Sequence, residues 1–315
     1  MTMQLSQHET AALRPEERPS APRLSIVIVS YNTRELLRAC LRSVRASVLD
    51  GAYEVFVVDN GSRDGSLTMV AAEFPEVVCL AETGDRGYAA ANNLALRRCR
   101  GAYRLLLNPD TELPSDALAT MLAFMDSHPR VGIAGPKLVK RNGRLDLACR
   151  RSFPTPTNAL YHFLRLPRLF PANPTFGAYN LTFRDPDRSY EVDSVCGAFM
   201  LLRASMLGEI GLLDETYWMY GEDLDLAFRA KRRSWQVYYN ADVEVKHYKG
   251  ESSKQRSLKC TYEFFRAMHV FYRKHYAPQR PAVVNALVTA GIALLGTASL
   301  VADRVRPAAL RRVSS

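Results

Sequence analysis

The chain has 315 residues, of which 47% are hydrophobic and 23% are charged, and its 42 Lys and Arg against 32 Asp and Glu give a net charge of +10. Such a composition is ordinary for a globular protein and leaves room for one large α/β domain with an appendage. The positive charge indicates an anionic membrane or a phosphorylated substrate, and not nucleic acid, because no nucleic-acid module is recognisable. Six scattered cysteines without a CxxC pair exclude a zinc site and a disulfide framework, and reduced thiols in a cytosol explain them most simply.

The first half of the chain alternates between strands and helices. Residues 1–22 contain three prolines and no apolar periodicity, so we expect a mobile arm rather than a signal peptide. Four strand–helix pairs follow, and this repetition predicts a parallel sheet covered on both faces. The strands are expected at 24–29, 55–58, 77–80 and 104–107. The first helix should start near residue 33, the second should end at about 74, the third should span 87–99, and the fourth should start at Pro114.

The first helix has a recognisable start in the sequence. Asn32 is a suitable N-cap, and Glu35 stands at the third helical position. This spacing is close to a capping box, in which the two side chains satisfy backbone N–H groups reciprocally.

The stretch Arg104–Thr111 is the centre of the predicted site. Three leucines form a short buried strand that stops at Pro109, and Asp110 follows. Ligands in open α/β sheets lie beyond the carboxyl ends of the strands, so Asp110 should project into a site. A carboxylate there can hold a divalent metal, and the metal can hold a diphosphate. The alternative is a turn Asp that only caps the next helix.

Other ways of holding phosphates are missing from the sequence. A dinucleotide site requires a glycine-rich turn after the first strand, but Val29–Thr33 contains no glycine. A P-loop and the glycine-rich loop of a kinase are absent as well. A metal on Asp110 would supply what these loops do not.

Seven segments between residues 23 and 255 form a recognisable series of motifs. They are LSIVIVSYNTRELLRACLRSV, VFVVDNGSRDGS, GYAAANNLAL, LLLNPDTEL, VCGAFMLLR, LDETYWMYGEDLDLAFRAKRRSW and VEVKHYKGESS. In content and order these motifs resemble the inverting family 2 glycosyltransferases of GT-A fold, within them the bacterial rhamnosyltransferase-like branch of cell-surface polysaccharide synthesis. The implied fold is a Rossmann-like, mostly parallel sheet with helices on both faces, in a domain at 23–275.

The resemblance implies a donor site for a nucleotide-diphosphate sugar. Asp59 would read a pyrimidine base, and the turn after it would close the pocket, with a simple Asn-Gly turn as the alternative. Asn108 occupies the first position of the DxD motif of the family, where the family pattern has an acid. Gly87 and Asn92 would lie beneath the nucleotide, with a helix-cap role as the alternative. The remaining residues of this site would line the pocket, namely Ser30, Tyr31, Asn32, Asn60, Gly61, Ser62 and Asp64.

The resemblance also implies a metal and a base. Asp110 would bind Mg²⁺ or Mn²⁺, and His247, in the H-x-x-G pattern of residues 247–250, would contact the metal or the diphosphate unless it is structural. Inverting transfer needs one base on the acceptor hydroxyl. Asp223 would be that base, with Glu222 as its competitor. An alternative is a capped helix in which Asp225 and Arg229 pair at i,i+4, and both can hold.

The acceptor side is expected after residue 137. The strand Val195–Leu202 opens with small residues, Gly197 and Ala198, which give backbone room for a sugar, and Trp218 and Tyr220 precede the acids. Prolines and aromatic residues between 154 and 186 predict an irregular flap, whose stretch 161–166 either touches a membrane or packs as an ordinary loop.

The tail at 276–315 is expected to be helical and membrane-associated. Residues 282–302 carry no charge, and their number matches the ~20 residues that a span requires. Arginines follow at 304, 306, 311 and 312. The stretch therefore spans the membrane, lies in its interface, or packs on the domain.

These features together predict a transferase. It would move a sugar, with rhamnose from dTDP-rhamnose as the first choice, to a lipid-linked glycan at the cytoplasmic face of a bacterial inner membrane. A catalytically silent nucleotide-sugar-binding or scaffold protein is the alternative, because the first acid of the DxD motif is missing.

Overall fold

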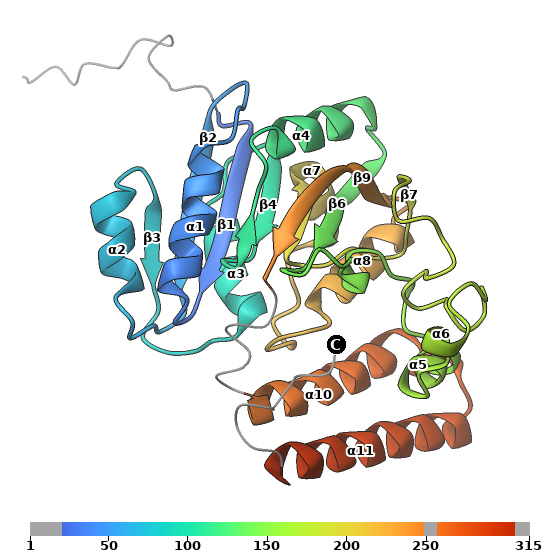
Figure 1. Ribbon diagram of the computed structural model, residues 1–315. Coiled ribbons are helices and arrows are strands. Elements are labelled where there is room, and N and C mark those ends of the chain that lie inside the picture. The colour runs from blue at the N-terminus through green and yellow to red at the C-terminus, as the bar shows by residue number, and fades with distance from the viewer. Residues whose placement is uncertain (1–20, 249–256, 306–315) are drawn as a thin grey trace, which may run out of the picture.

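The computed structural model describes residues 21–248 and 257–305. Most of the predicted N-terminal arm, residues 249 and 250 of the H-x-x-G pattern, and the last three arginines named above lie outside these ranges. Within them, one sheet has the strand order β3-β2-β1-β4-β8-β6-β9-β5, with β7 paired to β9 (Figure 1). The strands are β1 Leu24–Ser30, β2 Tyr53–Asp59, β3 Val78–Ala81, β4 Tyr103–Leu107, β5 Thr111–Glu112, β6 Val131–Val139, β7 Tyr190–Glu191, β8 Phe199–Arg203 and β9 Gln236–His247.

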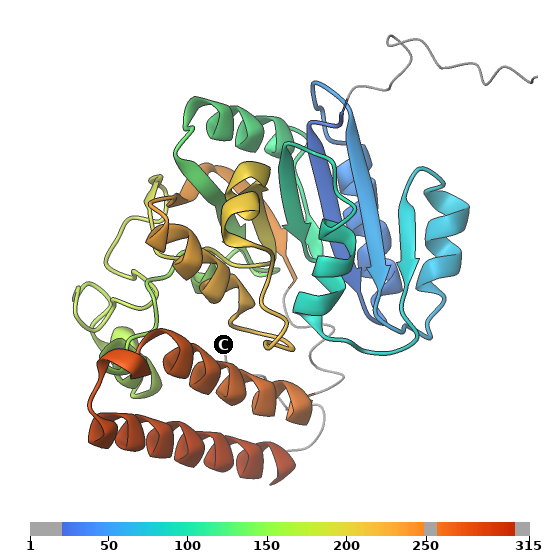
Figure 2. The same ribbon diagram turned by 180° about the vertical axis from the view of Figure 1, so that it is seen from behind.

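The first half of the sheet is parallel, as predicted. Strand β1 pairs with β2 and β4, and β2 pairs with β3, all in parallel. Every residue of β1 is buried, which explains its nearly continuous run of β-branched residues. Helix α1 (Arg34–Arg45) lies over one face of this half and α3 (Tyr88–Leu96) over the other, while α2 (Ser66–Glu73) lies beside β3 (Figures 1 and 2).

The second half of the sheet is mixed, which the strand–helix alternation did not predict. Strand β8 runs antiparallel to both β4 and β6, whereas β6 and β9 are parallel. The strand expected from Val195 starts only at Phe199, because the Phe199 N–H donates to the carbonyl of Cys196 at 3.3 Å and makes a turn there. His247 is the last residue of the long strand β9.

The predicted capping box is wrong. Helix α1 starts at Arg34, and its N-cap Thr33 makes no side-chain capping bond. Asn32 has a φ of 49°, in the left-handed region. Its side chain is used elsewhere, accepting from the N–H of Arg63 at 2.8 Å.

The remaining helices cover the second half and form a hairpin outside it. Helix α4 (Ala117–Ser127) begins three residues after Pro114, and α7 (Ala204–Ile210) and α8 (Glu222–Arg232) lie on the face that Figure 2 shows in front. The expected irregular flap contains two short helices, α5 (Pro156–Phe163) and α6 (Leu166–Leu169). The hairpin consists of α10 (Ser257–His275) and α11 (Ala282–Val305), so the helical prediction for 282–302 is confirmed.

Candidate active site

The turns after β1 and β2 lie side by side. The register pairs Ser30 with Asp59, so the two strands end together. One carboxylate oxygen of Asp59, Oδ2, accepts from the N–H of Ser62 at 2.9 Å. The other, Oδ1, is buried and has no hydrogen-bond partner among the described residues. A buried acceptor without a donor is costly, so this oxygen is suited to a ligand N–H.

Hydrogen bonds between the two turns hold them in place. Ser62 Oγ accepts from the N–H of Asn32 at 2.9 Å, and Asp64 accepts from the N–H of Arg34 at 2.8 Å. Gly61 adopts a φ of 87°, which a residue with a side chain rarely adopts. Tyr31 is partly exposed at the rim. The residues of both turns that were predicted to form the nucleotide-sugar site therefore lie together.

The floor of the same region is formed by Asn60 and the start of α3. Asn60 donates to Asp85 at 2.9 Å and accepts from the N–H of Arg86 at 3.0 Å. Asn92 is buried; its amide donates to the Tyr88 carbonyl at 2.8 Å, and its Oδ1 has no partner in the described part of the chain. Sequence reasoning missed Asp85, which no motif marks.

Asp110 and His247 meet because β5 and β9 are paired. The register places Thr111 opposite His247, so Asp110 lies next to the histidine. His247 Nε2 is 3.4 Å from Asp110 Oδ1, and His247 Nδ1 is 3.2 Å from Asp146 Oδ2. All three side chains are buried. Asp146 also caps a short 3-10 turn at 147–149 by accepting from the N–H of Ala148. No sequence motif marks Asp146 as part of the site.

The two carboxylates set the charge of His247. Burial alone would lower the pKa of the imidazole, but the hydrogen bonds to Asp110 and Asp146 raise it to about 9. The ring beside Asp110 is therefore protonated at neutral pH. A cation bound there would have to displace that proton.

The pair Glu222–Asp223 begins helix α8 and is buried against Arg151. Asp223 Oδ2 accepts from Arg151 at 2.5 Å and from the N–H of Gly197 at 3.3 Å, and its Oδ1 accepts from the N–H of Leu224. Arg151 is 72 residues away in sequence, and sequence reasoning did not find it. A guanidinium and two backbone amides thus fix the position of the Asp223 side chain.

Glu222 has a different environment from its neighbour. Burial, together with the charge on Asp223, raises the pKa of Glu222 to about 8. Its Oε2 is buried without a hydrogen-bond partner among the described residues. The two adjacent acids are therefore dissimilar: one is ion-paired, and the other is poised to hold or release a proton near neutral pH.

A short backbone path connects the two acidic centres. The N–H of Asn108, two residues before Asp110, donates to the Ala198 carbonyl at 2.9 Å. The preceding residue, Gly197, bonds to Asp223 as described, and its carbonyl accepts from the Tyr88 hydroxyl at 2.9 Å. The small residues at 197 and 198 thus lie between the end of β4 and the start of α8.

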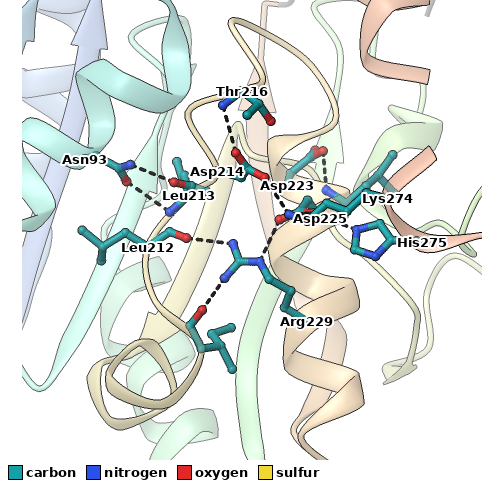
Figure 3. Close-up of polar contacts among 12 residues, drawn as sticks. Asn93, Leu212, Leu213, Asp214, Thr216, Asp223, Asp225, Arg229, Lys274 and His275 are labelled. Carbon is teal, nitrogen blue, oxygen red and sulfur yellow. Dashed lines mark hydrogen bonds and ion pairs between the residues drawn. The ribbon is translucent and has the colours of Figure 1, made fainter. Parts of the chain in front are cut away.

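Asp225 fixes helix α8 from its inner side. The predicted pair with Arg229 is present at 2.7 Å, but Lys274 and His275 from α10 also bind Asp225, each at 2.7 Å (Figure 3). Burial would raise the pKa of Asp225, but His275, Lys274 and Arg229 lower it to about 2. Arg229 also donates to the carbonyls of Ile210 and Leu212, so helix, loop and α10 are joined at one carboxylate.

Trp218 and Tyr220 lie in the loop before α8. The Trp218 carbonyl accepts from the N–H of Tyr88 at 2.6 Å, and a Cβ on Gly87 would come within 2.5 Å of the indole. Lys259 stacks on the Trp218 ring at 3.7 Å from its centroid. Tyr220 packs edge-on against Phe264 of α10. The expected pocket residues therefore connect α3 with α10.

Residues 25–211 match the family model described as Glycosyl transferase family 2. The chain is 27% identical over 241 residues to N-acetylglucosaminyl-diphospho-decaprenol L-rhamnosyltransferase of Mycobacterium tuberculosis, covering 73% of this chain and 77% of that protein. It is 25% identical over 234 residues to rhamnosyltransferase WbbL of Escherichia coli K12, covering 71% and 82% respectively.

Solved structures show the same fold. A mannosyltransferase of Pyrobaculum calidifontis, PcManGT, in complex with GDP-Man and Mn²⁺, matches with a TM-score of 0.55 and 20% identity, over 93% of this chain and 79% of that one. Staphylococcus aureus TarS 1–349 with UDP-GlcNAc matches with a TM-score of 0.54 and 17% identity, over 86% and 71%. The predicted GT-A fold is confirmed.

Proposed function

The chain belongs to glycosyl transferase family 2, and from this premise we propose that it transfers rhamnose from dTDP-rhamnose to a lipid-linked glycan with inversion at the anomeric carbon. The choice of sugar and acceptor is supported by the two relatives whose names specify rhamnosyl transfer, one of them to a decaprenol-linked substrate. The structural observation that carries the proposal is the proximity of two acidic centres, Asp110–His247 and Glu222–Asp223, at one end of the sheet.

The donor binds, in this proposal, at the turns after β1 and β2. The orphaned Oδ1 of Asp59 would accept the imide N–H of a thymine or uracil ring. Asn92, with a second buried acceptor lacking a partner in the described ranges, would lie beneath the sugar or ribose. Hydrogen bonds between the turns hold this pocket before the nucleotide arrives.

Asp110 and His247 fit a divalent cation. Their facing atoms are 3.4 Å apart, as two ligands of one ion can be, and Asp146 would keep the Nδ1 proton of His247 in place. No group of three or more acidic, histidine or cysteine ligands occurs in the described part of the chain, so phosphate oxygens and water would complete the shell, as is usual for Mg²⁺. Mg²⁺ or Mn²⁺ there would neutralise charge on the leaving diphosphate.

Asp223 is the proposed base. Its carboxylate is oriented by Arg151 and Gly197, and it would take the proton of the acceptor hydroxyl while that oxygen bonds to the anomeric carbon and the bond to the diphosphate breaks. Glu222 is the second candidate, because its Oε2 has no hydrogen-bond partner among the described residues and its raised pKa makes its deprotonated form a strong base.

The test uses purified protein, dTDP-rhamnose and a polyprenyl-diphosphate-linked N-acetylglucosamine acceptor with Mn²⁺. The expected product has an anomeric configuration opposite to that of the donor, as determined by NMR. Other dTDP- and UDP-sugars are compared in parallel. Donor binding without hydrolysis or transfer in any combination would instead support the silent binding or scaffold protein.

A further inference from the structure

Helix α11 exposes apolar side chains on its outer face, whereas the helices that cover the sheet bury theirs. Five of its apolar side chains point outward, and their spacing of four and seven residues places them on one stripe. The exposed fractions are 65% for Val283, 69% for Leu287, 72% for Leu294, 58% for Val301 and 81% for Val305. Ala290, also exposed, falls on the same stripe. A helix packed on a protein surrounded only by water would turn this face inward.

The opposite face of α11 is fastened to α10 along its whole length. Asn285 accepts from the Tyr272 hydroxyl at 2.7 Å, and at the other end the buried Asp303 accepts from Thr261 at 2.6 Å. Between them Gly296 lies so close to Phe265 that a Cβ would come within 3.1 Å of the ring. The small and polar side chains thus face the protein.

Helix α11 has the length and hydropathy of a membrane span, but its bonds to the charged helix α10 are incompatible with crossing a membrane. Its 24 residues have a mean hydropathy of 1.8 in the most apolar window, of which only 6% is buried. A crossing helix would have to leave α10, or take α10 with it. Leaving breaks the bonds of Asn285 and Asp303, and α10 carries charges that hydrocarbon does not accept, among them Glu263, Arg266 and Lys274.

We propose that α11 lies in the plane of an anionic lipid surface, docked on α10, with the stripe Val283, Leu287, Leu294, Val301 and Val305 among the acyl chains. Figures 1 and 2 show α11 as the outermost layer, with α10 between it and the domain. The exposed Arg280 and Arg304 flank the stripe and match anionic headgroups. A second copy of this chain is disfavoured as the partner, because each copy carries a net charge of +10.

The flap supplies further apolar side chains next to the hairpin. Phe163 of α5 stacks on Phe265 of α10, with ring centroids 6.1 Å apart. Leu160, Leu164, Leu169 and Phe170 of this region are more than half exposed. Helix α10 in turn binds helix α8, because Lys274 and His275 both contact Asp225. The lipid surface would therefore fix the height at which Glu222 and Asp223 meet a lipid-linked acceptor.

The test is sedimentation of the full chain with phosphatidylglycerol and with phosphatidylcholine vesicles, without donor or acceptor, so that its result does not depend on the proposed reaction. The wild type should sediment with the anionic vesicles. The double variant Leu287→Glu/Leu294→Glu should lower partitioning at least about 100-fold, because charges replace two leucines that would lie among the acyl chains. The control Val48→Glu changes a residue that is also 69% exposed but lies far from α11, and it should partition normally.

Depth measurements distinguish an in-plane helix from a span. Tryptophan is introduced singly at Leu287, Leu294 and Val301. The quenching of its fluorescence by lipids brominated at different acyl positions gives the depth of each site. Equal shallow depths of about 5–10 Å at all three sites are expected for an interfacial helix. A depth gradient along the helix would overturn the proposal in favour of a span. The proposal would also be overturned, in favour of packing between proteins, if the wild type does not sediment with anionic vesicles. The same holds if the wild type is a dimer and the double variant is a monomer.

Discussion

The donor half and the catalytic half of the site are built from different interactions. At the turns after β1 and β2, backbone N–H groups are the donors, and the side chains of Ser62, Asn32 and Asp64 accept from segments about 30 residues away. At β9 and α8, buried charged side chains make most of the bonds, joining Asp110 with His247, Asp223 with Arg151, and Asp225 with Arg229, Lys274 and His275. The first arrangement should tolerate the loss of one bond, whereas the second should not, because an unpaired buried charge is costly.

The largest effect is expected for Asp110→Asn. The amide is a poorer ligand for Mg²⁺ or Mn²⁺ and leaves His247 with one carboxylate instead of two, so transfer and metal-dependent donor binding should be abolished. The fold should persist, since Asp110 lies beyond the end of β4. Calorimetry with dTDP-rhamnose, with and without Mn²⁺, checks this. Undiminished turnover of the variant in EDTA would remove the metal from the proposal.

Asp223→Asn should lower kcat by about 10²- to 10⁴-fold with donor affinity nearly unchanged, the usual contribution of a general base. The matched comparison is Glu222→Gln at the neighbouring position. If the glutamine variant suffers the large loss and the asparagine variant does not, Glu222 is the base, and Asp223 with Arg151 orients it.

Much of the donor half could be predicted because its signals are local. A β-branched run followed by a polar turn identifies β1 with Ser30 and β2 with Asp59, and parallel strands bring such turns together. Arg151, Asp146 and Lys274 could not be predicted in the same way. Each is an ordinary charged residue in its own segment and acquires a role only through a partner about 50 to 100 residues distant.

The errors have the same origin. The capping box at Asn32 was a correct local pattern, but the bond to Arg63 from the next turn competes for the side chain. The strand expected at Val195 lost its first four residues to a turn that bridges β4 and α8. Tertiary contacts override local preference in both places.

Asp146→Asn should weaken Mn²⁺ binding about 10- to 100-fold, the usual effect of removing a carboxylate that orients a ligating histidine. Asparagine can still accept the N–H of Ala148, so the 3-10 turn at 147–149 should remain. Electron paramagnetic resonance of Mn²⁺ in the presence of dTDP gives the affinity independently of turnover. Unchanged affinity would mean that Asp146 only supports the fold.

The pH dependence of stability should differ between wild type and Glu222→Gln. Since the pKa of Glu222 is raised from about 4.5 to about 8, the native state binds more protons than the unfolded state between these values. Wild-type stability should therefore fall as pH rises from about 4.5 to 8, by up to about 1.4 kcal/mol per pH unit from this residue. The glutamine variant lacks this term, so urea unfolding across that range should give a flatter profile. Parallel profiles for the two proteins would mean that the pKa of Glu222 is not raised in the native state.

The smallest effect is expected in the donor half, for Ser62→Ala. The variant loses the bond from the N–H of Asn32 to Ser62 Oγ, but both residues are partly exposed, so water can replace the hydroxyl. The N–H of Ser62 still binds Asp59, and Asn32 still accepts from Arg63, so the two turns remain connected. A neutral bond of this kind contributes about 0.5–1.5 kcal/mol, so the Kd for dTDP should rise less than about tenfold. Ser47→Ala, which removes a hydroxyl bond at the end of α1, serves as the control. A loss as large as that of Asp223→Asn would mean that the two turns depend on single bonds as strongly as the ion pairs of the catalytic half do, and the contrast between the two halves would fail.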